Sequence, residues 1–162
     1  MTTTDANRHE HFMQLALEIG TIADSEGDMG VGSIVVQGDR IVGRGRNRTS
    51  TARDPMAQAE TEAIADACRT LGTVDLAGCT IYTTMEPCAM CAGALLNAKI
   101  DHWVLGGRFK SVGRTDLGRY SVESFADFMA AQIQVTSGIL QAECERLRTR
   151  YHERQARKQP GS

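Results

Sequence analysis

Hydrophobic and polar residues follow two different periods along the first third of the chain. Apolar residues recur every three or four positions over residues 12–23, which predicts a helix from about Ala6 to Asp24. Two short runs rich in valine and isoleucine follow over residues 31–36 and 40–46, with a Gly-Asp pair between them. This pattern is typical of a β-hairpin closed by a tight turn.

The middle of the chain alternates helical and strand-like segments. Asp54 followed by Pro55 is a helix-start signal, because the aspartate side chain can cap the first turn and proline fits inside it. The helix that it opens should end near Leu71, just before a glycine. After it we expect a strand over residues 79–85, a helix over 88–98 and a strand over 100–107.

The last third of the chain contains many glycines and ends in a clear helical pattern. A short apolar segment around residues 125–129 leads to a fifth strand, expected over residues 131–136. Apolar residues then recur at spacings of four, three and four from Leu140 to Tyr151, which predicts a C-terminal helix. This order of elements predicts an α/β fold, a three-layer sandwich in which helices cover both faces of a mixed five-stranded sheet.

Length and composition fit a single domain over residues 1–162. The chain is 41% hydrophobic and 23% charged, yet it has no apolar run of the ~18 residues that a membrane span needs. The N-terminus lacks the layout of a secretory signal, so we expect a cytoplasmic protein whose five cysteines stay reduced. Cysteines in close pairs are therefore candidate ligands or redox groups.

The net charge of −2 is unevenly distributed. Basic side chains outnumber acidic ones after Gln141, while the rest of the chain is acidic. A basic tail can contact nucleic acid, but a solvated helix end that frays from about residue 152 is the simpler interpretation. Arg44, Arg46 and Arg48 alternate along the second strand, as a phosphate-contacting stripe or as a solvated strand face.

Glu60 is the first residue whose position calls for a chemical explanation. On the expected helix it shares one stripe with Ile64, Ala67 and Leu71, which places a carboxylate on the apolar face. A buried carboxylate is costly unless a charged partner or a reaction requires it. We therefore treat Glu60 as a candidate catalytic residue.

Cys88 and Cys91 form the second chemical feature. They lie three residues apart at the start of a helix, where both thiols share one face and the helix N-terminus favours the thiolate form. The spacing fits a thioredoxin-type redox pair as well as two ligands of a zinc ion, which needs at least one further ligand. If the two helix starts meet, Glu60 lies beside whatever the cysteines hold.

Together these features resemble the cytidine deaminase superfamily, in its branch of guanine, cytosine and tRNA adenosine deaminases. The resemblance extends over most of the chain and rests on the segments GRGRNR, DPMAQAE, TIYTTMEPCAMCAGAL and VTSGILQAECERL. The segment EPCAMCAG after a strand is highly specific. It follows the pattern of zinc deaminases, a glutamate in one motif and Pro-Cys-x-x-Cys in the next.

The resemblance implies a role for each matching residue. Cys88 and Cys91 would bind zinc, and Glu60 would transfer a proton from the zinc-bound water to the departing amine. Asn47 and the main-chain N–H of Ala59 would hold the substrate ring. Proteins of this family generally form dimers or tetramers, so a homodimer is expected.

Gln58 departs from the family pattern, which has histidine or, in some members, cysteine as the third zinc ligand. An amide oxygen is neutral and a poorer zinc donor than imidazole. Three explanations stay open: a substitution that empties or weakens the site, zinc still held by both cysteines with Gln58 or waters, and a relative that no longer deaminates. We favour the first two, because the rest of the set is present. The histidines that could replace the third zinc ligand are His9, His11, His102 and His152, none of which is near either motif in the sequence.

The substrate has to be inferred from residues around this core. After the fourth strand, we expect Phe109 to stack on a flat ring and Asp116 to contact its N–H groups. The acidic body favours a small amino-bearing heterocycle: cytosine, isocytosine, guanine or an amino-triazine. The second candidate is the wobble adenosine of tRNA, which the basic tail would help to bind. A non-catalytic binding subunit and a redox protein are the alternatives of other classes.

Overall fold

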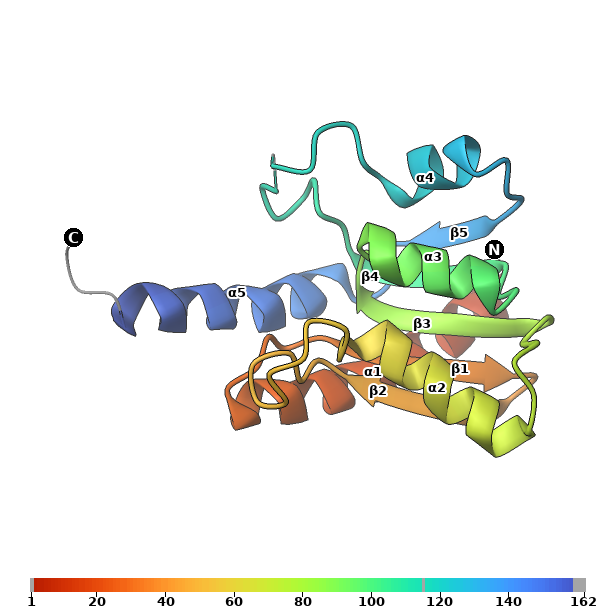
Figure 1. Cartoon of the computed structure of the whole chain (residues 1–162), viewed down its shortest axis with the longest axis horizontal. Coiled ribbons are helices and arrows are strands. Elements are labelled where there is room, and N and C mark those ends of the chain that lie inside the picture. The colour runs from red at the N-terminus through yellow and green to blue at the C-terminus, as the bar shows by residue number, and fades with distance from the viewer. Residues whose placement is uncertain (1, 115, 159–162) are drawn as a thin grey trace.

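The computed structural model describes residues 2–114 and 116–158, which form a mixed five-stranded sheet with helices on both faces (Figure 1). The sheet has the order β2-β1-β3-β4-β5, in which β1 is antiparallel to β2 and β3, and β4 is parallel to β3 and β5. In chain order the elements are α1 (Thr3–Glu26), β1 (Gly32–Gln37), β2 (Arg40–Arg46), α2 (Ala59–Leu71), β3 (Cys79–Met85), α3 (Ala89–Asn97), β4 (His102–Gly107), α4 (Val122–Phe128), β5 (Gln134–Ser137) and α5 (Gln141–Lys158).

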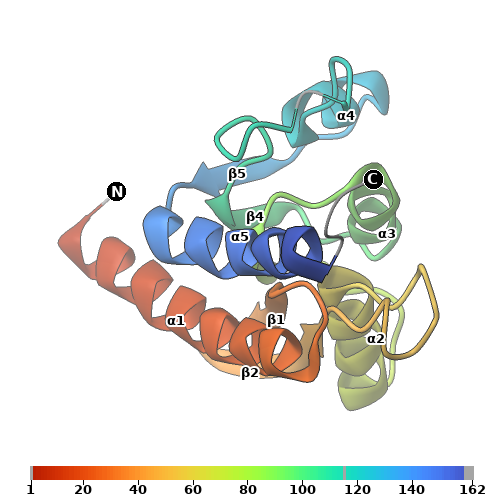
Figure 2. The same cartoon turned by 90° about the vertical axis from the view of Figure 1, so that its left-hand side faces the viewer.

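Two apolar cores separate the three layers. Side chains alternate along β3, so Ile81 packs toward α2 and α3 while Tyr82 packs toward α1 and α5. The first core is built around Trp103 and Leu95, and the second around Phe12 and its neighbours on α1. Figure 2 shows α1 and α5 together on one side of the sheet, with α2 and α3 on the other. The expected three-layer α/β fold is confirmed.

The predicted start of α2 at Asp54 and Pro55 is wrong. Asp54 does not cap the helix, because its Oδ1 accepts a hydrogen bond from the Met56 N–H at 2.8 Å within the preceding loop. The helix begins at Ala59, and Gln58 takes the N-cap position. As a result, Gln58 and Glu60 lie at the tip of α2 rather than in its second turn.

Two glycines on β2 let this helix lie close to the sheet. A Cβ atom at Gly45 would meet the carbonyl oxygen of Ala59, and one at Gly43 would meet the carbonyl oxygen of Ala63. Glycine is the residue that allows a backbone to approach this closely. The close packing fixes the first turn of α2, and with it the position of Glu60.

The C-terminal elements differ from expectation in detail. The apolar segment around residues 125–129 forms the short helix α4, capped by Ser121, and β5 starts later and is shorter than expected. The basic tail is helical up to Lys158 rather than frayed from about residue 152. Within the described ranges, no helix has the length and apolarity to cross a membrane.

Candidate active site

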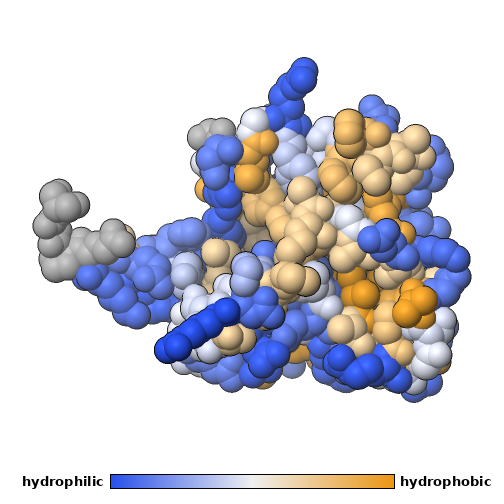
Figure 3. Space-filling view, in the orientation of Figure 1, coloured by the Kyte–Doolittle hydropathy of each residue, from blue (hydrophilic) through white to orange (hydrophobic). Residues whose placement is uncertain are grey.

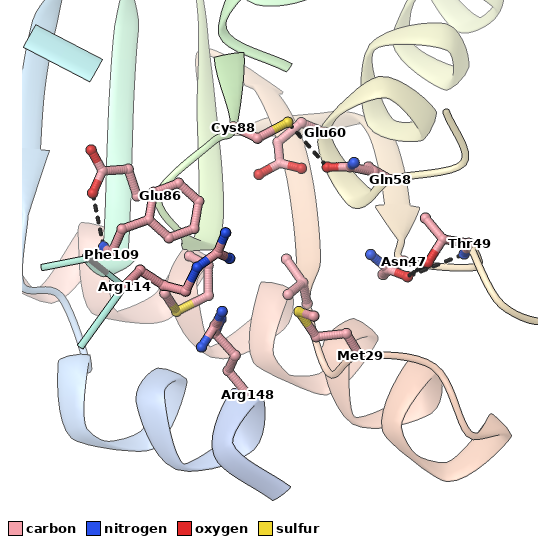
Figure 4. A pocket seen from close by; sticks show the side chains of 12 residues that line it. Met29, Asn47, Thr49, Gln58, Glu60, Glu86, Cys88, Phe109, Arg114 and Arg148 are labelled. Atoms are coloured by element: carbon pink, nitrogen blue, oxygen red, sulfur yellow. Dashed lines mark hydrogen bonds between the residues drawn. The ribbon is translucent and has the colours of Figure 1, made fainter. Parts of the chain in front are cut away.

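A cavity of about 310 Å³ lies where the N-terminal tips of α2 and α3 meet (Figure 4). Its walls come from segments that are far apart in the sequence. They are the β1 entry, the loop after β2, both helix tips, the loop after β4, and α5. The lining residues are Met29, Val31, Asn47, Thr49, Gln58, Glu60, Met85, Glu86, Cys88, Phe109, Arg114 and Arg148.

Three side-chain atoms that could bind a metal, one oxygen and two sulfurs, meet at one end of this cavity. Oε1 of Gln58 lies 3.4 Å from Sγ of Cys88 and 3.3 Å from Sγ of Cys91. Cys88 is the N-cap of α3 and Cys91 lies in its first turn, so both sulfurs project from the tip of that helix. The structure therefore brings together the two motifs that the sequence places thirty residues apart.

The pKa values of the two thiols shift in opposite directions. A hydrogen bond from Cys91, together with main-chain N–H groups at the start of α3, lowers the pKa of Cys88 to about 6. The bond to Cys88 and burial raise the pKa of Cys91, which is fully buried. Within the pair, Cys88 is therefore the thiol that loses its proton more readily.

Glu60 is buried beside the sulfurs, with 3% of its surface exposed. Burial raises its pKa to about 7, in spite of a hydrogen bond from Thr83. Oγ1 of Thr83 donates to Oε1 of Glu60 at 3.0 Å, and Oγ of Ser33 donates in turn to Oγ1 of Thr83 at 2.8 Å. Two buried hydroxyl groups on β1 and β3 therefore fix the carboxylate so that it faces the cavity.

Cys88, Cys91 and Gln58 could hold a metal ion, with Gln58 as the weakest of the three ligands. No group of three His, Cys, Asp or Glu side chains placed to hold a metal occurs among the residues that the structure describes. Gln58 explains this result, because its amide oxygen occupies the third position beside the two sulfurs. Two thiolates and an oxygen are ligand types that zinc accepts, although an amide oxygen binds zinc less strongly than imidazole.

Asn47 and Phe109 are lining residues with groups suited to a flat ring. Oδ1 of Asn47 accepts hydrogen bonds from the N–H and hydroxyl of Thr49, which leaves its amide nitrogen pointing into the cavity (Figure 4). Phe109 is half-buried in the wall, and its N–H donates to Glu86 at 2.9 Å. Ala59 and Asp116 do not line the cavity, so their predicted contacts with the substrate stay predictions.

Glu86 lines the cavity, although the sequence pattern did not indicate it. Glu86 lies directly before Pro87 in the cysteine motif, and its buried carboxylate accepts hydrogen bonds from Arg108 and from the N–H groups of Phe109 and Val122. This network ties the loop after β4 to the start of α3. In the sequence, Glu86 could have been noticed as a charged residue at the end of an apolar strand, next to the cysteine motif.

Two cavity arginines were also missed. Arg114 donates to Asp116 through Nε at 2.6 Å and Nη2 at 2.8 Å, and this pair lowers the pKa of Asp116 to about 2. Arg148 enters the cavity from α5. Neither arginine belongs to a motif, and only the path of the chain in space brings them to the site.

Other candidates lie away from this site. None of the four histidines lines the cavity. Nδ1 of His9 lies 3.0 Å from the hydroxyl of Tyr82, and Nε2 of His102 lies 3.2 Å from Oγ1 of Thr136. Arg46 pairs with Glu26 and Arg48 with Glu62, so the proposed phosphate stripe on β2 is largely neutralised within the chain. Those ion pairs favour the solvated strand face.

Comparison with known families agrees with this geometry. Residues 6–107, which include both motifs, match the family described as the cytidine and deoxycytidylate deaminase zinc-binding region. The chain belongs to this family. The resemblance noted from the sequence is thereby confirmed, and the chain is an enzyme of the zinc-type hydrolytic deaminase class.

Relatives of this deaminase include tRNA adenosine deaminases and guanine deaminases. The tRNA-specific adenosine deaminase of Haemophilus influenzae is 33% identical over 151 residues, 92% of this chain and 86% of that protein. A solved structure from a study of A-to-I editing by tRNA deaminases at the wobble position is 32% identical, with a TM-score of 0.73 over 85% of this chain and 98% of that chain. The guanine deaminase from Nitrosomonas europaea is 28% identical, with a TM-score of 0.73 over 88% of this chain and 84% of that chain.

Proposed function

We propose that this deaminase replaces the exocyclic amino group of a nucleobase by oxygen, with water as the second substrate. The observation that supports it best is the convergence of a buried carboxylate, two thiols and an amide oxygen on one cavity. A redox pair would need the two cysteines alone, whereas the position of Glu60 is explained only by proton transfer. The reaction consumes water and releases ammonia.

Cys88, Cys91 and Gln58 are the residues that would hold the zinc ion. When bound, zinc supplies the nucleophile by lowering the pKa of water to about 7. The two cysteines provide charge and sulfur ligands, and Gln58 provides a neutral oxygen. We infer that this enzyme binds zinc more weakly than a relative with histidine at this position.

Glu60 moves the protons of the reaction. Its carboxylate first moves one proton of the attacking water to the ring nitrogen, and then moves the remaining hydroxyl proton to the departing amino group, so that ammonia leaves and a carbonyl group remains. The hydrogen bond from Thr83 holds Oε1, which orients the other oxygen of Glu60 toward the cavity. General acid–base catalysis requires this fixed orientation, because the proton must be within hydrogen-bond reach.

Asn47 and Phe109 are the residues that would orient the ring. The free amide nitrogen of Asn47 can donate to a ring nitrogen or carbonyl oxygen. Phe109 presents a ring at the wall on which a flat heterocycle can stack. The N–H of Ala59 at the tip of α2 remains a predicted additional donor, and Asp116 would act only through a movement of Arg114.

The first candidate substrate is adenosine in tRNA. This changes the order expected from the sequence, because the curated relatives above 30% identity include several tRNA-specific adenosine deaminases. A free amino-bearing base is the second candidate. It is favoured by the likeness to guanine deaminase and by a cavity at the small end of the ~300–1,000 Å³ range of ligand pockets.

Ammonia release with two kinds of substrate tests the proposal. The zinc-supplemented enzyme would be incubated with tRNA that carries adenosine at the wobble position, and separately with guanine, cytosine and isocytosine. Inosine formed in tRNA supports the first candidate, and ammonia from a free base supports the second. Ligand binding without ammonia, even in Gln58→His, would show a non-catalytic binding subunit instead.

A homodimer is the expected assembly. Apolar side chains gather on the face that α3 and α4 form (Figure 3), and Met90, Phe128 and Met129 are exposed there. Contiguous exposed apolar surface is typical of a contact between proteins. Light scattering of the purified protein would give twice the mass of the chain if the dimer forms through this face.

A further inference from the structure

Arg148 is a buried cation that forms no ion pair with the residues that the structure describes. It projects from α5 into the cavity (Figure 4), with only 4% of its surface exposed. Its Nη2 atom is buried, and no hydrogen-bond partner for it exists among the residues that the structure describes. Guanidinium stays charged in proteins, so burying it without a partner is strongly unfavourable.

The surroundings of Arg148 increase this imbalance. Burial lowers the pKa of Arg148, and the second guanidinium in the cavity wall, that of Arg114, lowers it further, whereas Asp116 acts more weakly in the opposite direction. The carboxylate of Asp116 is bonded to Arg114. Glu145, on the same helix as Arg148, accepts hydrogen bonds from Ser111 and Gln141 instead.

A second arginine near the site shows how the fold satisfies a cation when no ligand is involved. Arg108 donates to Glu86 at 3.0 Å and to Glu123 at 2.9 Å, so its charge is matched by two carboxylates of the chain. Arg148 has no such pairing among the described residues. The difference indicates that the counter-ion of Arg148 enters with the ligand.

We propose that Arg148, assisted by Arg114, binds an oxyanion that the substrate carries in addition to its amino-bearing ring. This inference rests on the proposed function, since both groups share one cavity with Glu60 and Cys88. A guanidinium fork matches the oxygens of a phosphate or carboxylate in geometry and charge. Two sources share this chemistry: the phosphate next to a nucleotide in tRNA, and an anionic substituent on a small heterocycle.

Equilibrium dialysis with radioactive inorganic phosphate tests the subsite without catalysis. The variant Arg148→Met keeps an unbranched apolar stem that can pack as the arginine stem does, but removes the charge. Arg146→Met is the matched control, because Arg146 lies on the same helix and is largely exposed outside the cavity. We expect one phosphate site per chain, weakened about 10-fold or more by Arg148→Met and less than about 2-fold by Arg146→Met.

Thermal unfolding separates a ligand-binding role from a structural one. If Arg148 awaits a ligand, Arg148→Met should unfold at the same or a higher temperature than the parent, because an unpaired buried charge is removed. Added phosphate should raise the unfolding temperature of the parent and of Arg146→Met, but not that of Arg148→Met. A lower unfolding temperature of Arg148→Met, or equal phosphate binding by all three proteins, would overturn the proposal. So would the absence of phosphate binding in the parent.

Matched substrates then identify the source of the oxyanion. AMP, GMP and CMP would be compared with their nucleosides as inhibitors or substrates, beside tRNA. A loss in Arg148→Met for the nucleotides but not the nucleosides assigns the subsite to a small anionic substrate. A loss for tRNA alone assigns it to the nucleic-acid backbone. Equal losses for charged and uncharged ligands contradict the subsite, and phosphate binding without any deamination would leave it standing while rejecting the proposed function.

Discussion

The two sides of the cavity differ in how completely the protein satisfies its own polar groups. On the side of the α2 and α3 tips, Glu60 accepts a hydrogen bond from Thr83, and both sulfurs contact Gln58. On the side of α5, the buried Nη2 atom of Arg148 lacks a partner among the described residues. The first side is preorganised for a reaction, and the second side has charge left for a ligand.

This difference separates catalysis from recognition within one site. Preorganised groups act on the bond that changes, so substitutions on the helix-tip side should change turnover or metal binding whichever substrate is used. Groups that wait for a ligand act on what is bound, so substitutions on the α5 side should change the choice of substrate. Three substitutions on the helix-tip side, from the largest expected effect to the smallest, test this division.

Glu60→Gln should have the largest effect. The amide keeps the shape of the side chain but cannot accept the proton of water, so kcat should fall by about 10²- to 10⁴-fold. Steady-state ammonia release measures the loss, with circular dichroism to confirm folding. Glu62→Gln is the matched control, because Glu62 pairs with Arg48 outside the cavity. Full activity of Glu60→Gln would remove Glu60 from the mechanism.

Gln58→His should tighten zinc binding. Even partners of the ligands change metal affinity by about 10- to 100-fold, so a change of ligand from amide oxygen to imidazole should lower the dissociation constant by at least about 10-fold. Competition with a chromophoric chelator measures this constant. Gln58→Ala is the companion variant: weaker binding than the parent shows that the amide oxygen is a ligand, and equal affinities of all three proteins would show that position 58 does not contact the metal.

Thr83→Val should have the smallest effect of the three. It removes the hydrogen bond to Glu60 while keeping the shape of the side chain, and we expect kcat to fall by roughly 10-fold with little change in KM. Thr84→Val is the control, since the hydroxyl of Thr84 instead accepts from the Gly32 N–H. If both variants lose activity equally, Thr83 has a structural role and not an orienting one.

The sequence predicted the layers of the fold and the two motifs that meet at the cavity. Helical and strand periods identified the elements because one face of each is buried, and the same reasoning marked Glu60 as a carboxylate on an apolar face. The start of α2 was wrong because Asp54 and Pro55 also suit a loop turn, and a local signal cannot separate the two.

Arg148 could not be predicted for a different reason. It directly follows Leu147, which packs in the core, and a basic residue at the edge of an apolar stripe is ordinarily solvated. Its burial depends on where α5 crosses the end of the sheet, and on the loop that carries Arg114. Both are tertiary facts that no local pattern contains.

The central claim is that the tips of α2 and α3 form one metal-dependent reaction site. Crystals of the zinc-soaked protein, measured with X-rays at the zinc absorption edge, test it most directly. We predict one anomalous peak per chain in contact with both Cys88 and Cys91, with Gln58 or water beside it and Glu60 facing the open position. A peak elsewhere, or cysteines joined to each other with no metal between them, would contradict the claim.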